Sequence, residues 1–191
     1  MDYNSDIFVE QFPIVKRFLY HLIYYRELWA AYHGLQFGSE FWAHTIDAHL
    51  LQAANLWCMV FGSQGCNHTH WKNLSKGDTE ELQQSFRQGL FEQTDLTSEQ
   101  WNQYWHDMKD FRDKYAAHRE LNYDKPIPDF TIALKVAYYY DRWIREVISP
   151  DILEEPPLEQ SSEALKRAVA PLITQLLKKT KGYDQETEQI A

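Results

Sequence analysis

An arginine and a histidine six residues apart are the side chains of this sequence best suited to acid–base chemistry. Arg112 is followed by Asp113, and His118 follows Ala116 and Ala117, whose small side chains leave room for a ligand. An arginine guanidinium holds phosphate oxygens with a planar fork of N–H donors. A histidine imidazole, whose ordinary pKa is about 6.5, can take a proton from a ribose 2′-hydroxyl and return one to a leaving oxygen. The pair therefore suits phosphodiester cleavage, with Asp113 orienting one of the two side chains.

The same residues also have a purely structural interpretation. On a helix with 100° per residue, Arg112 and His118 lie three positions on either side of Tyr115, so each flanks the apolar stripe by about 60°. A histidine at a helix end can interact with the terminal carbonyl groups, and an arginine beside it can be solvated. Spacing alone leaves both interpretations open, and the structural one is the more common.

The order arginine, polar residue, a few residues and then histidine, near the end of a long helix, resembles the signature of the HEPN superfamily. Residues 112–120 read RDKYAAHRE and resemble the abortive-infection (AbiU-type) branch. The AANLW segment at 53–57, within an expected N-terminal helical hairpin, and the aromatic helix that ends in the motif are similar to the same branch. The resemblance covers roughly residues 5–150.

The resemblance implies an antiparallel helical bundle and, for many members, a metal-independent endoribonuclease that needs no cofactor. In those enzymes two protomers pair, so that two Arg/His sets form a composite cleft. On this chain Arg112 would bind the phosphate, His118 would be the general acid/base, and Asp113 would fill the polar position. The substrate contacts would come from the neighbouring residues Tyr115, Lys114 and Arg119. The products would carry a 2′,3′-cyclic phosphate.

The implied setting is phage defence or a toxin–antitoxin pair, with RNA as the substrate and an antitoxin or defence protein as a further partner of the homodimer. Other members of the superfamily are non-catalytic helical modules that bind a nucleotide or a partner protein. That second function is the alternative to the nuclease.

Two further groups of residues contain side chains that could bind a metal ion. Cys66, His68 and His70 have residue types that bind zinc, but no fourth ligand is nearby and the spacing is not a common one. His44 and His49 lie five positions apart on an expected helix, about 140° from each other, so they cannot share an ion. We interpret the first group as a polar loop and the second as surface or hydrogen-bonded groups, and we expect no metal site.

The elements that carry these residues are expected to be long helices, because glycine and proline are scarce and apolar residues recur at steps of three and four. Ser5 and Asp78 are expected N-caps, and Thr97 with Gln100 reads as a capping box. The connection at 34–38 is short and favours an antiparallel hairpin. The expected helices cover residues 5–33, 39–62, 79–91, 98–119, 129–148 and about 165–177.

The fold class is therefore all-α, an antiparallel helical bundle of HEPN-like type with an additional C-terminal helix. Residues 1–150 are expected to form the bundle. Residues 151–191 are expected to form an acidic proline linker, an amphipathic helix with a kink at Pro171, and a polar tail without regular structure after Gly182.

The composition limits the binding partners and the cellular compartments that can be expected for this chain. The net charge of -9 opposes broad, non-specific binding to nucleic acid or to anionic membranes. The basic run at 178–181 fits the negative end of a helix dipole better than a nucleic-acid contact. Two cysteines do not make a disulfide framework, and the acidic N-terminus does not resemble a signal peptide. No stretch approaches about 18 uncharged apolar residues, so we expect a cytoplasmic protein without a membrane span.

Overall fold

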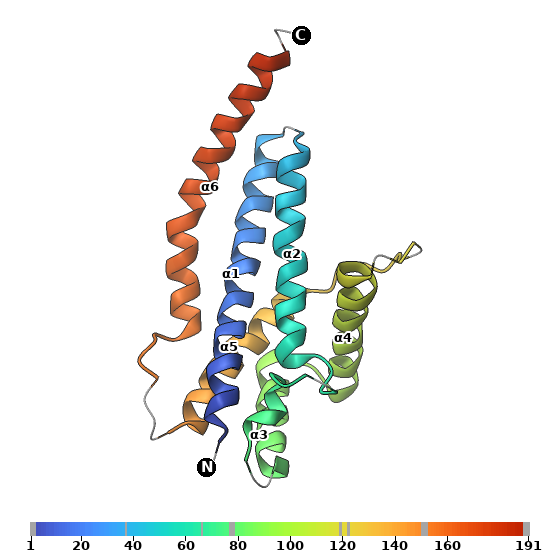
Figure 1. Cartoon of the computed structure of the whole chain (residues 1–191), viewed down its shortest axis with the longest axis vertical. Helices are drawn as coiled ribbons and strands as arrows, with labels where there is room; N and C mark the ends of the chain where they lie inside the picture. The colour runs from blue at the N-terminus through green and yellow to red at the C-terminus, as the bar shows by residue number, and fades with distance from the viewer. Residues whose placement is uncertain are drawn as a thin grey trace.

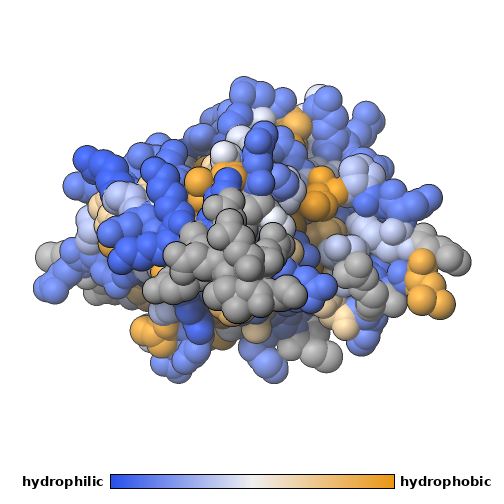
Figure 2. Space-filling model, turned by 90° about the horizontal axis from the view of Figure 1, so that it is seen from above, coloured by the Kyte–Doolittle hydropathy of each residue, from blue (hydrophilic) through white to orange (hydrophobic). Residues whose placement is uncertain are grey.

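A computed structural model describes residues 3–36, 38–65, 67–76, 79–118, 120–121, 123–149 and 153–188, with the backbone alone at Thr79 and at 182–188. Within these ranges the regular structure is helical, and the β-type pairing is limited to an isolated bridge between Tyr3 and Ser75. The expected all-α bundle is confirmed. The face of the bundle seen from above is mostly hydrophilic, with scattered apolar spots (Figure 2).

Helices α1 (Ser5–Leu35) and α2 (Glu40–Phe61) form the expected antiparallel hairpin (Figure 1). The N-cap of α1 is Asn4 rather than Ser5, because the Asn4 side chain accepts from the backbone N–H groups of Asp6 and Ile7 at 3.2 and 3.4 Å. The helix continues through Pro13 and ends at Leu35, and its C-cap Gln36 has a left-handed φ of 50°.

The main core lies where this hairpin meets α3 (Thr79–Thr94) and α5 (Phe130–Val147), with a short 3₁₀ helix η1 (Trp71–Leu74) between α2 and α3. Its largest fully buried side chains include Trp57 and Tyr140. Helices α3 and α5 approach closely at Gly89, where a Cβ would collide with the phenol of Tyr139. Asp78, the expected cap of α3, lies outside the described residues.

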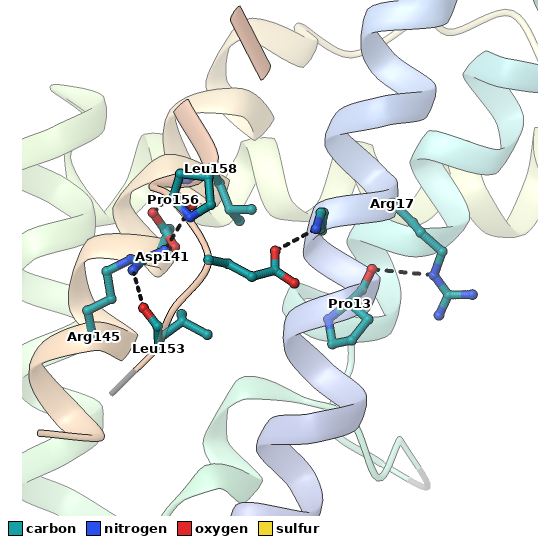
Figure 3. Close-up of polar contacts among 9 residues, drawn as sticks. Pro13, Arg17, Asp141, Arg145, Leu153, Pro156 and Leu158 are labelled. Atoms are coloured by element: carbon teal, nitrogen blue, oxygen red, sulfur yellow. Dashed lines mark hydrogen bonds and ion pairs between the residues drawn. The ribbon is translucent and has the colours of Figure 1, made fainter. Parts of the chain in front are cut away.

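The last helix, α6 (Leu158–Glu188), runs beside α1 (Figure 1). Its first backbone N–H is held by Asp141 of α5, whose buried carboxylate accepts from Leu158 N at 2.9 Å and from Arg145 Nε at 3.1 Å (Figure 3). Arg145 also donates to the carbonyl oxygens of Leu153 and Pro156, so it ties the linker down. The helix continues to Glu188, so the prediction of an unstructured segment from Gly182 to that residue was wrong.

The helix before the motif differs from the prediction in its second half. An α-helix α4 covers Ser98–Asp110, and a π-helix η2 covers Phe111–Ala117, in place of one α-helix over 98–119. The capping box of Thr97 and Gln100 is confirmed, with reciprocal hydrogen bonds of 3.2 and 2.9 Å. A π-helix pairs residues five apart, so the 100° spacing assumed for Arg112 and His118 does not hold there.

Candidate functional site

The π-helix η2 carries Arg112 next to a carboxylate. The Nε of Arg112 is buried and lies 2.5 Å from Asp113 Oδ1, as an ion pair without the alignment of a hydrogen bond. The Arg112 side chain as a whole is 30% exposed and that of Asp113 is 49% exposed. The neighbouring carboxylate therefore sits beside one edge of the guanidinium, while part of the side chain reaches solvent.

His118 stands at the point where the chain leaves η2. Its backbone N–H donates to Asp113 O at 3.0 Å and closes the last wide turn, while its φ of -127° and ψ of 88° are no longer helical. The residue is exposed. It is thus the His118 backbone that caps the helix, and the imidazole lies on the surface where a substrate can reach it.

The expected substrate-binding residues have different surroundings. The Tyr115 ring stacks on Phe111 at 5.1 Å between centroids and lies 5.7 Å from the ring of Tyr123. Lys114 Nζ lies 3.5 Å from Asp110 Oδ2. Arg119 lies outside the described residues. Tyr115 therefore helps to pack η2 against the core, and Lys114 sits beside an acidic group of its own helix.

Two carboxylates of α4 share one lysine. Lys125 lies 2.6 Å from Asp110 Oδ2 and 3.8 Å from Asp107 Oδ1. The hydrogen bond from Lys125 is the main cause that holds the pKa of Asp110 below its usual value. Next to this group a cavity of about 260 Å³ is lined by Tyr104, Tyr123 and the 125–129 segment. Arg112 and His118 line neither this cavity nor the cavity of about 330 Å³ beside Trp101 and Trp105.

A thiol lies beneath the motif. Cys58 of α2 is buried, with Sγ 3.9 Å from Met108 O. Burial raises the pKa of Cys58 to about 12, and the positive charges of Arg112 and Lys109 offset only part of that rise. The thiol is therefore neutral, which argues against a nucleophilic role. Sequence reasoning missed this contact between α2 and α4, the helix before the motif.

The candidate zinc ligands do not form a site within the described part of the chain. His70 Nδ1 accepts from Lys72 N at 3.2 Å, so its Nε2 carries the proton and donates to Gly62 O at 3.1 Å. Both nitrogens of His70 are thus occupied, and Cys66 lies outside the described residues. No group of three His, Cys, Asp or Glu side chains is arranged to hold a metal ion among the residues that the structure describes.

A pair of histidines joins α1 to α2. His49 faces His21 rather than His44, with 2.9 Å between the two Nδ1 atoms. Burial, more than any nearby charge, lowers the pKa of both imidazoles. The register of the hairpin was the signal for this contact, because residues 21 and 49 lie at similar distances along the chain from the turn.

Within the described ranges, no helix is both long enough and apolar enough to cross a membrane. Comparison of the chain with protein-family models, with curated proteins and with solved structures finds no match.

Proposed function

We propose that this chain is a metal-independent endoribonuclease of HEPN type, acting in phage defence or as a toxin in the cytoplasm. The observation that supports it best is the placement of the motif on a seven-residue π-helix that ends at an exposed His118. π-Helices make up well under 1% of residues and occur frequently at functional sites. The resemblance of the motif to the HEPN signature supplies the reaction.

In this reaction the imidazole of His118 accepts the proton of a ribose 2′-hydroxyl. The 2′-oxygen forms a bond to phosphorus, the bond from phosphorus to the 5′-oxygen breaks, and the 5′-oxygen takes the proton that the His118 imidazolium returns. The products are a 2′,3′-cyclic phosphate and a 5′-hydroxyl. Arg112 stabilises the negative charge that grows on the phosphate oxygens, and the Asp113 carboxylate positions the guanidinium.

The cleft is completed by a second copy of the chain. Arg112 and His118 adjoin no cavity among those described for one protomer, whereas two motifs placed across a two-fold axis would form a shared groove. The active form is therefore a symmetric dimer with the two His118 residues near the axis. Sedimentation at micromolar concentration should show the dimer, and a monomer would contradict this arrangement.

The decisive experiment is incubation of the purified protein with total RNA and with tRNA in the presence of EDTA. Wild-type protein should cleave RNA, leave cyclic phosphate ends and leave single-stranded DNA intact. His118→Ala should lose about two to four orders of magnitude in rate, the span of a general acid/base. His44→Ala removes another exposed histidine, on α2, and should keep the wild-type rate.

Three results would favour the alternative, a non-catalytic module that binds a nucleotide or a partner protein. They are loss of cleavage in EDTA, cleavage of DNA as well as RNA, and a folded wild-type dimer that cuts neither.

A further inference from the structure

A cavity of about 330 Å³ opens beside the N-terminal half of α4, between η1 and α3. Three indole rings contribute to its wall, together with an amide and two cationic side chains at its margin. These residues are Trp71, Trp101, Trp105, Asn102, Lys72 and Arg87. Aromatic faces with a few polar groups are typical of a site that takes a planar, polar ligand.

Lys72 and Arg87 bring two positive charges to the same cavity. Burial, and after it the charge of Arg87, lowers the pKa of Lys72. The Lys72 Nζ also lies 5.8 Å from the centroid of the Trp71 ring. An anion placed between the two cations would relieve their mutual repulsion, so the charge arrangement favours an anionic ligand.

Hydrogen bonds to backbone carbonyl groups at the end of α2 hold the Trp105 side of the cavity wall in place. The Trp105 indole N–H donates to Phe61 O at 2.8 Å and approaches Gly62 O at 3.3 Å. Nε2 of His70 donates to the same Gly62 carbonyl, and burial lowers the pKa of His70 to about 4, which keeps this ring neutral. The indole of Trp105 is therefore held in place before any ligand arrives, which reduces the entropy lost on binding.

The cationic and aromatic row continues from the cavity towards the motif. Lys109 follows Trp105 by one helical turn and places its Nζ 4.1 Å from the indole centroid. Arg112 comes three residues later, in the first turn of η2. The eleven residue-to-residue steps from Trp101 to Arg112 span about 16 Å at the α-helical rise.

Two acidic side chains of α4 lie away from this row. Asp107 and Asp110 are paired with Lys125, on the side of the smaller cavity. Asp107 and Asp110 therefore lie apart from the tryptophans and Lys109, while Asp113 pairs with Arg112 at the end of the row. In a chain of net charge -9, such a local strip can attract a polyanion that the molecule as a whole repels.

We propose that this row binds a single RNA strand, with one base in the 330 Å³ cavity against Trp101 and the phosphates running past Lys72, Arg87 and Lys109 to Arg112. Alternating stacking platforms and cations are how proteins hold single-stranded nucleic acid. The inference rests on the proposed nuclease function, for which it gives the path of the substrate and the position of a base remote from the scissile bond.

Binding is tested on the full-length His118→Ala protein, so that the strand stays intact, by following tryptophan fluorescence as a short single-stranded RNA is added. Counterion release contributes a slope of about -0.7 per phosphate contact to log K against log salt, so four cations predict a slope of about -3. Replacing both Lys72 and Arg87 by Gln should halve that slope and weaken binding. The control is the replacement of Lys178 and Lys179, two exposed lysines of α6, by Gln, which makes the same charge change.

Stacking is tested by Trp101→Ala, which should weaken binding roughly 5- to 150-fold, the equivalent of one base–aromatic stack. Because Trp101 also packs near Trp57, circular dichroism must show that this variant is folded. If it is not, the Lys72 and Arg87 variant still decides the matter. Equal weakening by the α6 control, or equally tight binding of a mononucleotide, would overturn the proposed strand path.

The outcomes also separate this inference from the nuclease proposal. If RNA binds in the predicted way but wild-type protein never cuts it, the result would support the strand path and contradict the proposed nuclease function. If the Lys72 and Arg87 variant cuts RNA with an unchanged KM, the result would support the nuclease function and contradict the strand path.

Discussion

Arg112 and Asp113 are neighbours in the chain, and the π-helix sets the Arg112 Nε 2.5 Å from Asp113 Oδ1. The carboxylate lies beside the Nε edge of the guanidinium. This pairing gives Asp113 a positioning role rather than a reacting one, and the two roles differ in the kinetics of substitution.

We predict that Asp113→Asn lowers kcat on RNA by up to about 10²-fold, the cost of misplacing a catalytic group by about 1 Å. Arg112→Ala should cost about 10²- to 10³-fold, and Arg112→Lys should recover only part of it, because an ammonium lacks the planar fork. Steady-state kinetics check both, with Asp107→Asn on the other face of α4 as the control. A loss at Asp113→Asn as large as that of His118→Ala would assign the proton transfer to the carboxylate instead.

The second prediction concerns His70 and acid stability. Burial lowers the pKa of His70 to about 4 in the folded chain, against about 6.5 when unfolded. The unfolded state therefore binds a proton first as pH falls. This contribution to stability is complete above pH 6.5 and is lost progressively down to about pH 4. It amounts to at most about 3 kcal/mol.

Urea unfolding at several pH values between 7 and 4 measures the effect. His70→Gln should flatten the dependence of the unfolding free energy on pH, although His21 and His49, whose pKa values are also lowered, will leave part of it. His118→Gln, at an exposed position, should leave the curve unchanged. If His70→Gln follows the wild-type curve, His70 is not buried in its neutral form.

The hairpin of α1 and α2 and the capping box at Thr97 could be predicted from sequence, because both depend on local chemistry. Apolar residues at helical spacing and a cap with its partner three residues on are signals contained in a short window. The helical class followed from the same signals.

The change from α4 to the π-helix could not be found in this way. The apolar pattern through Met108, Phe111 and Tyr115 fits an α-helix, and the wider turn shows only in the backbone hydrogen bond from His118 to Asp113. The geometry of the candidate site could not be predicted for the same reason, because the exposure of His118 depends on where the π-helix ends. Lys109 over Trp105, by contrast, had a local signal, because the two residues are four apart.

Asp141 is a further residue whose role lay outside any local pattern, and it carries the third prediction. Its buried carboxylate accepts from the first N–H of α6 and from Arg145, which in turn holds the linker (Figure 3). Asp141→Ala leaves a buried donor and an arginine without their acceptor. We expect a loss of about 3 kcal/mol in the free energy of unfolding, the low end for a broken buried ion pair, because Arg145 is partly exposed.

Chemical denaturation followed by circular dichroism measures this loss. Glu146→Gln removes an exposed carboxylate from the same helix and should change the unfolding free energy by less than about 0.5 kcal/mol. A wild-type midpoint for Asp141→Ala would mean that α6 docks on α1 without this connection.

The last prediction sets two glycine-to-alanine changes against each other. Alanine is favoured over glycine inside a helix by about 1 kcal/mol, and Gly34 of α1 has nothing within 4 Å of an added Cβ, so Gly34→Ala should stabilise the protein by up to that amount. At Gly89 of α3 the same methyl group would overlap the phenol of Tyr139, whose hydroxyl donates to Ser85 O at 3.3 Å. Overpacking of this kind costs about 1–3 kcal/mol. Thermal unfolding of the two variants should therefore shift in opposite directions, and a shared direction would mean that α3 and α5 do not approach at Gly89.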